Sequence, residues 1–173
     1  MASLQIKTAD EFAALDLASL WKVRRAARES AAFRRVLQLF VEHGGPIPVE
    51  EIVAGLPDGT ATAARQALVA LDSDDLIRIQ DGQVDVAYPL TASSTPFVVR
   101  LRDGRERFAC CAVDALGIAP MIGRSIEIRS RCHHCAAPLE LTSTPDGAGP
   151  EGSAVMLWIG RRADDRCKIA DSL

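Results

Sequence analysis

A thiol and a carboxylate lie three residues apart in an apolar stretch of this chain. Cys111 and Asp114 belong to the run FACCAVDALGIAPMIG, which extends from Phe108 to Gly123. If this run is helical, residues three apart lie on one face, about one turn from each other. A soft nucleophile beside a proton carrier in apolar surroundings suits the capture of a soft metal together with the movement of a proton. We therefore take Cys111 and Asp114 as candidate catalytic residues.

The expected helix would favour the reactive forms of both groups. Cys111 falls in its first turn or two, where unpaired backbone N–H groups favour a thiolate, so we expect the pKa of this thiol to be lowered. The apolar neighbours of Asp114 should desolvate its carboxylate and raise its pKa toward values useful for proton transfer. The alternative interpretation is a buried structural cysteine beside an aspartate at a helix end.

The cysteines of the chain cluster in its C-terminal half, at positions 110, 111, 132, 135 and 167. In a reducing compartment we expect thiols or metal ligands rather than a disulfide framework. Cys132 and Cys135 enclose two histidines in a Cys-x-x-Cys pattern, which is half of a typical zinc site. A structural zinc would need His133, His134 or Cys167 to complete its ligands.

The composition indicates a folded protein without a strongly charged partner. The chain has 173 residues, of which 48% are hydrophobic, and a formal net charge of −3. This charge gives no global attraction to nucleic acid or to an anionic membrane, and we interpret the basic stretch Lys22–Arg35 as a solvated helix face. The N-terminal residues lack the pattern of a secretory signal, and no apolar run reaches membrane-spanning length. We expect a cytoplasmic protein with no membrane partner.

The N-terminal part predicts three helices followed by a β-hairpin, which is the order of a winged helix. The segments are an amphipathic helix through Phe33–Val41 that is stopped by Gly44-Gly45-Pro46, a short helix over Val49–Ala54, a third helix capped by Thr60, and strands at Leu76–Ile79 and Val84–Tyr88 around Asp81-Gly82.

The third of these helices is poorly suited to DNA. It offers only Arg65 and Gln66 to phosphates or base edges, and Asp72, Asp74 and Asp75 follow at once. These carboxylates would repel a phosphate backbone, so we expect no nucleic-acid partner and a structural or lid-forming role for this unit.

The second half predicts a small sheet with at least one buried helix, after a polar connector at Thr91–Pro96. The expected strands are Phe97–Leu101, Arg105–Phe108, Ser125–Arg129, Pro138–Thr142 and Ala154–Ile159, with a loop over Thr144–Gly152. We therefore predict an α+β fold. A winged-helix-like part, residues 1–90, would pack on a small mixed α/β core, residues 91–173, with a buried cysteine-bearing helix.

This second half resembles the core of the alkylmercury lyase family, in the run CCAVDALGIAPMIGRSIEIRSRCHHCAAPLELT. The features in common are a Cys-x-x-Asp motif, an apolar stretch with proline and an Ile-Gly-Arg run, and a further cysteine and an Ala-Pro before a strand. The preceding YPLTASSTPFVVRL also resembles that family. The similarity extends over residues 33–160, and its specific part is confined to residues 108–142.

The resemblance implies cleavage of a carbon–mercury bond by protonation, which gives a hydrocarbon and Hg(II). Cys111 would match the mercury-capturing cysteine of the family, and Asp114 the aspartate that moves a proton between thiol and leaving carbon. An organomercury compound would be the substrate, with small thiols or a mercury-accepting protein as partners. No cofactor would be required, and Hg(II) would be the bound product.

The chain departs from the family pattern at a second active-site cysteine, which the family carries after the strand expected at Ala154–Ile159. This chain ends at Leu173, about where that segment should begin, and the setting of Cys167, ADDRCKIADSL, does not match it. Either the chain is truncated, or Cys167, Cys110 or Cys135 substitutes, or the protein binds mercury without efficient turnover. Cys132 matches a family cysteine with a structural role, whereas Cys135 does not.

Two other functions fit the same residues. A metal-binding or metal-sensing protein without catalysis would chelate zinc, copper or mercury through Cys111, Cys132, Cys135 and Cys167. A metal-responsive transcription factor is the third hypothesis, and the poor third helix argues against it.

Overall fold

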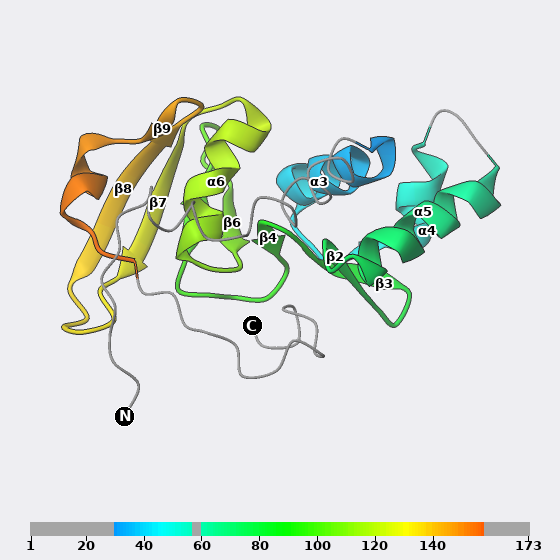
Figure 1. The fold of residues 1–173 in the computed structure, drawn as a ribbon, viewed down its shortest axis with the longest axis horizontal. Helices are drawn as coiled ribbons and strands as arrows, with labels where there is room; N and C mark the ends of the chain where they lie inside the picture. Colours follow the sequence, from blue (N-terminus) through cyan, green and yellow to red (C-terminus); the bar gives the residue numbers. More distant parts are fainter. Residues whose placement is uncertain (1–29, 57–59, 158–173) are drawn as a thin grey trace, which may run out of the picture.

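The computed structural model describes residues 30–56 and 60–157 (Figure 1). Its elements in chain order are α3 (Ala31–His43), β1 (Ile47–Pro48), α4 (Val49–Ala54), α5 (Ala61–Ser73), β2 (Ile77–Gln80), β3 (Gln83–Ala87), β4 (Leu90–Thr91), β5 (Val98–Arg100), β6 (Glu106–Ala109), α6 (Ala112–Ile122), β7 (Ile126–Arg131), β8 (Pro138–Thr144), β9 (Gly147–Ala148) and the 3-10 helix η1 (Pro150–Ala154). The expected mixed α and β composition is confirmed.

The described strands form one antiparallel sheet in the order β1-β3-β4-β6-β5-β7-β8-β9, with β2 paired to β3. Helix α3 packs near β1, β3 and β4, whereas α6 lies against β6, β7, β8 and β9 (Figure 1). One hydrophobic core runs from Phe33 on α3 through Leu90 to Ile118 on α6. Both the sheet and the hydrophobic core include residues on either side of position 91. The division of the chain into two domains at that position stays a prediction.

The helix and hairpin signals of the N-terminal part are confirmed. Helix α4 covers Val49–Ala54, and α5 begins after Thr60, whose side chain accepts a hydrogen bond from the Ala63 N–H at 3.3 Å. Asp81 and Gly82 connect β2 to β3 with φ of 50° and 74°. Positive φ at both central residues defines the type I′ turn, whose twist matches that of the paired strands.

Helix α6 carries the Cys-x-x-Asp motif, but its first cysteine stands outside the helical turns. Cys111 is the N-cap residue in extended conformation, whereas the sequence predicted it within the helix. Pro120 has no N–H for the carbonyl of Leu116, four residues earlier. The hydroxyl of fully buried Ser143 donates to that carbonyl at 3.2 Å instead, which ties α6 to β8.

The C-terminal segment differs from its prediction. The loop expected over Thr144–Gly152 contains β9 and most of η1, because the chain folds back after Thr144 and pairs Gly147 with it. The prediction of a strand at Ala154–Ile159 is wrong for the residues that the structure describes, 154–157. Ala154 ends η1, and Val155–Leu157 are not in a strand. Met156 is 77% exposed, so this apolar side chain does not pack against the sheet.

Besides β9, the sequence analysis missed two short strands, because their pairing is purely tertiary. Strands β1 and β4 have two residues each, too few to show an alternating pattern, and they exist through their pairing with β3 and β6.

The described helices include none that is both long and apolar enough to span a bilayer. Of the basic stretch Lys22–Arg35, positions 22–29 lie outside the described residues.

A single arginine joins the end of α3 to the middle of the sheet. The Arg107 guanidinium on β6 donates to the carbonyl oxygens of Phe40 at 2.8 Å, Val41 at 2.7 Å and Glu42 at 2.8 Å. These are among the last carbonyls of the helix, which have no partner within it and carry its negative dipole end. Partial burial lowers the pKa of Arg107, but an arginine remains charged at neutral pH.

We expect Arg107→Met to lower the free energy of unfolding by about 2 kcal/mol, because it leaves several carbonyl groups without their charged donor. Urea unfolding followed by circular dichroism measures this change. Arg100→Met on neighbouring β5 is the control, since that side chain is exposed and its ion pair with Glu127 spans 3.7 Å; it should cost under about 1 kcal/mol. Equal losses in the two variants would contradict the role of Arg107.

Candidate active site

The side chains of Cys111 and Asp114 contact each other at the start of α6. The Cys111 thiol donates to Asp114 Oδ2 at 2.9 Å, and the Asp114 backbone N–H donates to Cys111 Sγ at 3.4 Å. The second of these bonds is that of an N-cap side chain to the backbone N–H three residues on. The Asp114 carboxylate differs from the partner residue of a capping box, because it accepts from the Cys111 thiol rather than from the backbone N–H of Cys111. Both side chains are half-buried, so a small molecule can approach the sulfur.

The prediction of a lowered pKa for the Cys111 thiol is wrong. Burial raises the pKa of Cys111 to about 11, and Asp114 adds to the rise by accepting the thiol proton and through its charge. The backbone N–H groups at the helix start act in the opposite direction and contribute less. The thiol therefore keeps its proton at neutral pH and holds it against the carboxylate.

Cys110 is placed away from this pair, although it is adjacent in sequence. Consecutive side chains of an extended backbone project to opposite sides, and Cys111 is extended. Cys110 is 5% exposed and packs in a small buried cluster with Val86 and Tyr88. Burial strongly raises the pKa of the Cys110 thiol. We conclude that Cys110 is a packing residue in this structure.

Two polar residues that the sequence did not single out affect the surroundings of Cys110. The Thr95 hydroxyl donates to the Ala109 carbonyl at 2.7 Å, which anchors the end of β6 just before Cys110. The Arg78 guanidinium, paired with Asp85 at 2.6 Å, partly offsets the rise in the pKa of Cys110. The polar connector and the hairpin contained these residues, but no local spacing related either of them to position 110.

Cys132 and Cys135 occupy the turn between β7 and β8. Backbone N–H groups of Cys135 and His134, together with the Cys135 thiol, lower the pKa of Cys132. Within the described residues, no three His, Cys, Asp or Glu side chains form a group that could hold a metal. The structure therefore does not gather the predicted set Cys111, Cys132 and Cys135 into one metal site, and Cys167 lies outside the described residues.

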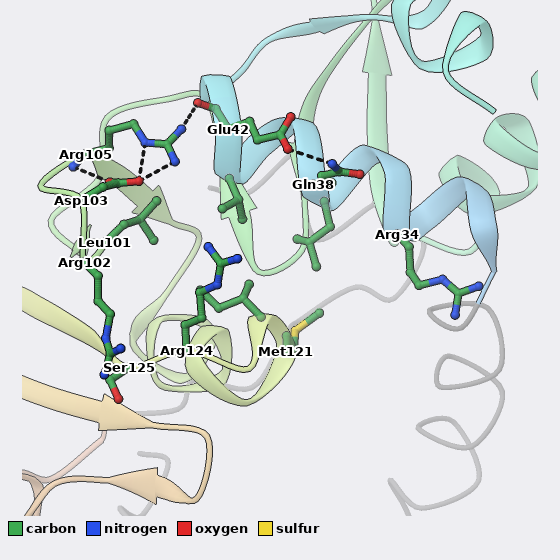
Figure 2. A pocket seen from close by; sticks show the side chains of 13 residues that line it. Arg34, Gln38, Glu42, Leu101, Arg102, Asp103, Arg105, Met121, Arg124 and Ser125 are labelled. Atoms are coloured by element: carbon green, nitrogen blue, oxygen red, sulfur yellow. Dashed lines mark hydrogen bonds and ion pairs between the residues drawn. The ribbon is translucent and has the colours of Figure 1, made fainter. Parts of the chain in front are cut away.

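A cavity of about 730 Å³ lies at the opposite end of α6 from Cys111. Figure 2 shows its lining side chains, which come from α3, from the turn between β5 and β6, and from the C-terminal end of α6. There Arg105 binds Asp103 at 2.6 Å and holds the pKa of that carboxyl at about 2. Neither Cys111 nor Asp114 lines this cavity, so the candidate chemistry does not depend on it.

Comparison with known proteins gives a consistent result. Residues 90–173 match the family model described as alkylmercury lyase. The chain is 35% identical over 116 residues to an alkylmercury lyase of Staphylococcus epidermidis, which covers 66% of this chain and 50% of that protein. It is 33% identical over 114 residues to an alkylmercury lyase of Streptomyces lividans, with 66% and 50% covered. The chain thus spans about half the length of the curated relatives it matches.

The fold also has a solved counterpart. The crystal structure of the mercury-bound form of MerB2 superposes with a TM-score of 0.59 at 18% identity, covering 78% of this chain and 66% of that one. At this identity the likeness shows a common fold. The resemblance inferred from the Cys-x-x-Asp run is confirmed.

We expect Asp114→Asn to lower the pKa of Cys111, because the substitution removes the negative charge and leaves only a neutral amide oxygen as acceptor for the thiol proton. Alkylation of Cys111 by iodoacetamide at pH 8, followed by mass spectrometry of its peptide, should be faster. The gain should be severalfold per unit of pKa, since the thiolate fraction rises about tenfold while its nucleophilicity falls. Asp146→Asn, in the exposed turn between β8 and β9, should leave the rate unchanged; a slower rate in Asp114→Asn would disprove the coupling.

We expect Ala136→Gly to stabilise the turn that holds Cys132 and Cys135. Ala136 has a φ of 57°, in the left-handed region that costs a residue with a Cβ about 1–2 kcal/mol. Glycine removes this strain, and the free energy of unfolding should rise by about 0.5–1 kcal/mol after the larger entropy of the unfolded chain is subtracted. Ala137→Gly next to it, where φ is negative, should instead be destabilising.

Proposed function

Because residues 90–173 of this chain match the family model described as alkylmercury lyase, we propose that the protein cleaves the carbon–mercury bond of organomercurials to a hydrocarbon and Hg(II). The observation that carries this proposal is the 2.9 Å hydrogen bond from the Cys111 thiol to Asp114 Oδ2. It joins a soft metal ligand to a proton acceptor in a half-buried site.

In the capture step, the Cys111 sulfur replaces its proton with mercury. The proton moves along the existing hydrogen bond to Asp114 Oδ2, a new bond forms from Sγ to mercury, and the thiol or halide ligand that the organomercurial carried departs. A protonated resting thiol suits this step, because its proton passes to Asp114 rather than to solvent. Soft sulfur selects the soft metal over the harder cations.

In the cleavage step, Asp114 delivers the proton to carbon. The electron pair of the carbon–mercury bond takes up the proton from the Asp114 carboxyl, the hydrocarbon leaves, and Hg(II) stays on Cys111 Sγ. A carbanion would not leave unprotonated, so the acid must lie within reach of the metal-bound carbon. Asp114 lies one helical turn from the sulfur and satisfies this requirement.

We further infer that α3, α4, α5 and the β2–β3 hairpin form a winged-helix unit with a structural role. The order of these elements supports the assignment. Arg65 on α5 is engaged by Glu50, with a distance of 2.6 Å between Nη2 and Oε2. This pairing leaves α5 with little positive charge to offer to a phosphate backbone.

The test is release of benzene from phenylmercury in the presence of excess small thiol. The wild-type chain should release it, and Asp114→Ala should lower the rate by about 100-fold or more while mercury remains bound to Cys111. Cys111→Ser should abolish both binding at this position and release. Asp146→Asn serves as the control for loss of an acidic group.

A non-catalytic chelator gives a different result in the same assay. It would take up mercury in a fixed ratio and release no benzene from any variant. Full activity in Asp114→Ala would also rule out the proposed proton path, whatever the binding data.

A further inference from the structure

The turn between β7 and β8 brings together two thiols that the proposed reaction does not use. The backbone N–H of Cys132 donates to the Ala137 carbonyl, and that of Ala136 donates to the Cys132 carbonyl, both at 2.8 Å. These bonds close a tight loop with Cys132 at its start and Cys135 near its end. The Cys135 thiol lies close enough to Cys132 to contribute to the lowered pKa of the Cys132 thiol.

The surroundings of this turn favour binding through sulfur. Cys132 is half-buried and Cys135 is exposed, so the pair is open to an incoming ion. The Arg131 guanidinium donates to the Ala136 carbonyl at 3.2 Å, which holds a positive charge at the turn. This hydrogen bond helps to hold the shape of the turn that carries the two thiols.

The sheet register places this turn at the same end of the strands as Cys111. Phe108 on β6 and Arg129 on β7 both pair with Val98 on β5. Cys111 and Cys132 each follow three residues after one of these partners, so the chain leaves the sheet toward both cysteines at one end (Figure 1). Strands β6 and β7 are separated only by β5, which corresponds to about 10 Å.

We propose that Cys132 and Cys135 form a second Hg(II) site that receives the ion from Cys111 after the carbon–mercury bond is cleaved. The inference rests on the proposed function for the source of the ion. Two cysteines with no third clustered ligand among the described residues suit a two-coordinate soft cation. Zinc would need four ligands in a tetrahedral site.

The transfer is a ligand exchange without any change in oxidation state. Bonds form from mercury to Cys132 Sγ and to Cys135 Sγ, while the bond to Cys111 Sγ breaks. The two thiols of the turn lose their protons; one proton returns to the Cys111 sulfur and the other passes to solvent. Cys111 and Asp114 are then ready for another organomercurial.

The experiment isolates the turn in the full chain with Cys111→Ser as background. The protein is incubated with mercuric chloride and excess monothiol and desalted, and its mercury is measured by plasma mass spectrometry. About one mercury per chain should be retained, with two sulfur neighbours by X-ray absorption. Adding Cys132→Ser or Cys135→Ser should each remove it, whereas adding Ala136→Gly or Cys167→Ser should not.

Several outcomes would overturn the inference. Unchanged retention after Cys132→Ser or Cys135→Ser would do so, and so would loss of the ion with Cys167→Ser. Retention of zinc offered under the same conditions, in a four-coordinate site, would refute the choice of cation. Circular dichroism and thermal unfolding of each variant exclude a simple loss of the fold, because Ala136→Gly keeps both thiols and should fold at least as well.

A second readout separates this inference from the proposed function. In the chain with Cys111 present, Cys132→Ser should release benzene in a single turnover at the wild-type rate but leave the mercury on the Cys111 peptide. Mercury binding at the turn without any benzene release from the wild type would refute the lyase activity alone. Benzene release with no mercury ever reaching the turn would refute the transfer alone.

Discussion

The chemistry proposed for this protein depends on one hydrogen bond, from the Cys111 thiol to the Asp114 carboxylate at the first turn of α6. Helix-end N–H groups favour a thiolate, while burial and the neighbouring negative charge oppose it. The opposing effects prevail and place the pKa of Cys111 at about 11. The same contact that caps the helix therefore keeps a proton between the two groups to which we assign the proposed protonolytic reaction.

The rest of the fold holds this contact in place. Ser143 supplies the donor that Pro120 removes from α6, and the Thr95 hydroxyl anchors the strand end that leads into Cys110. Arg107 fastens α3 to β6, the strand immediately before the cysteines. Each of these is a side chain that satisfies a backbone carbonyl from a distant segment, so the position of the site depends on contacts far apart in sequence.

Local signals in the sequence were sufficient for the helices and the hairpin. Thr60 and the Asp81-Gly82 pair act through their own backbone and immediate neighbours, which is why their patterns predicted a helix start and a turn correctly. The Cys-x-x-Asp spacing also predicted the pairing of thiol and carboxylate. The errors concern segments such as β4, β9 and Val155–Leu157, where the presence or absence of a partner strand decides the structure.

The sequence by itself determined which reactive groups this protein has and which of them share a helical turn or a tight loop, because those relations act over three residues. Only the tertiary structure decided the sign of the pKa shift at Cys111, since that depends on how much solvent the packed elements exclude. It also decided that Cys110 faces a buried cluster. The pairing of β5 with both β6 and β7 brings Cys111 and Cys132 to the same end of these strands, and strand register is a non-local property that spacing along the chain does not encode.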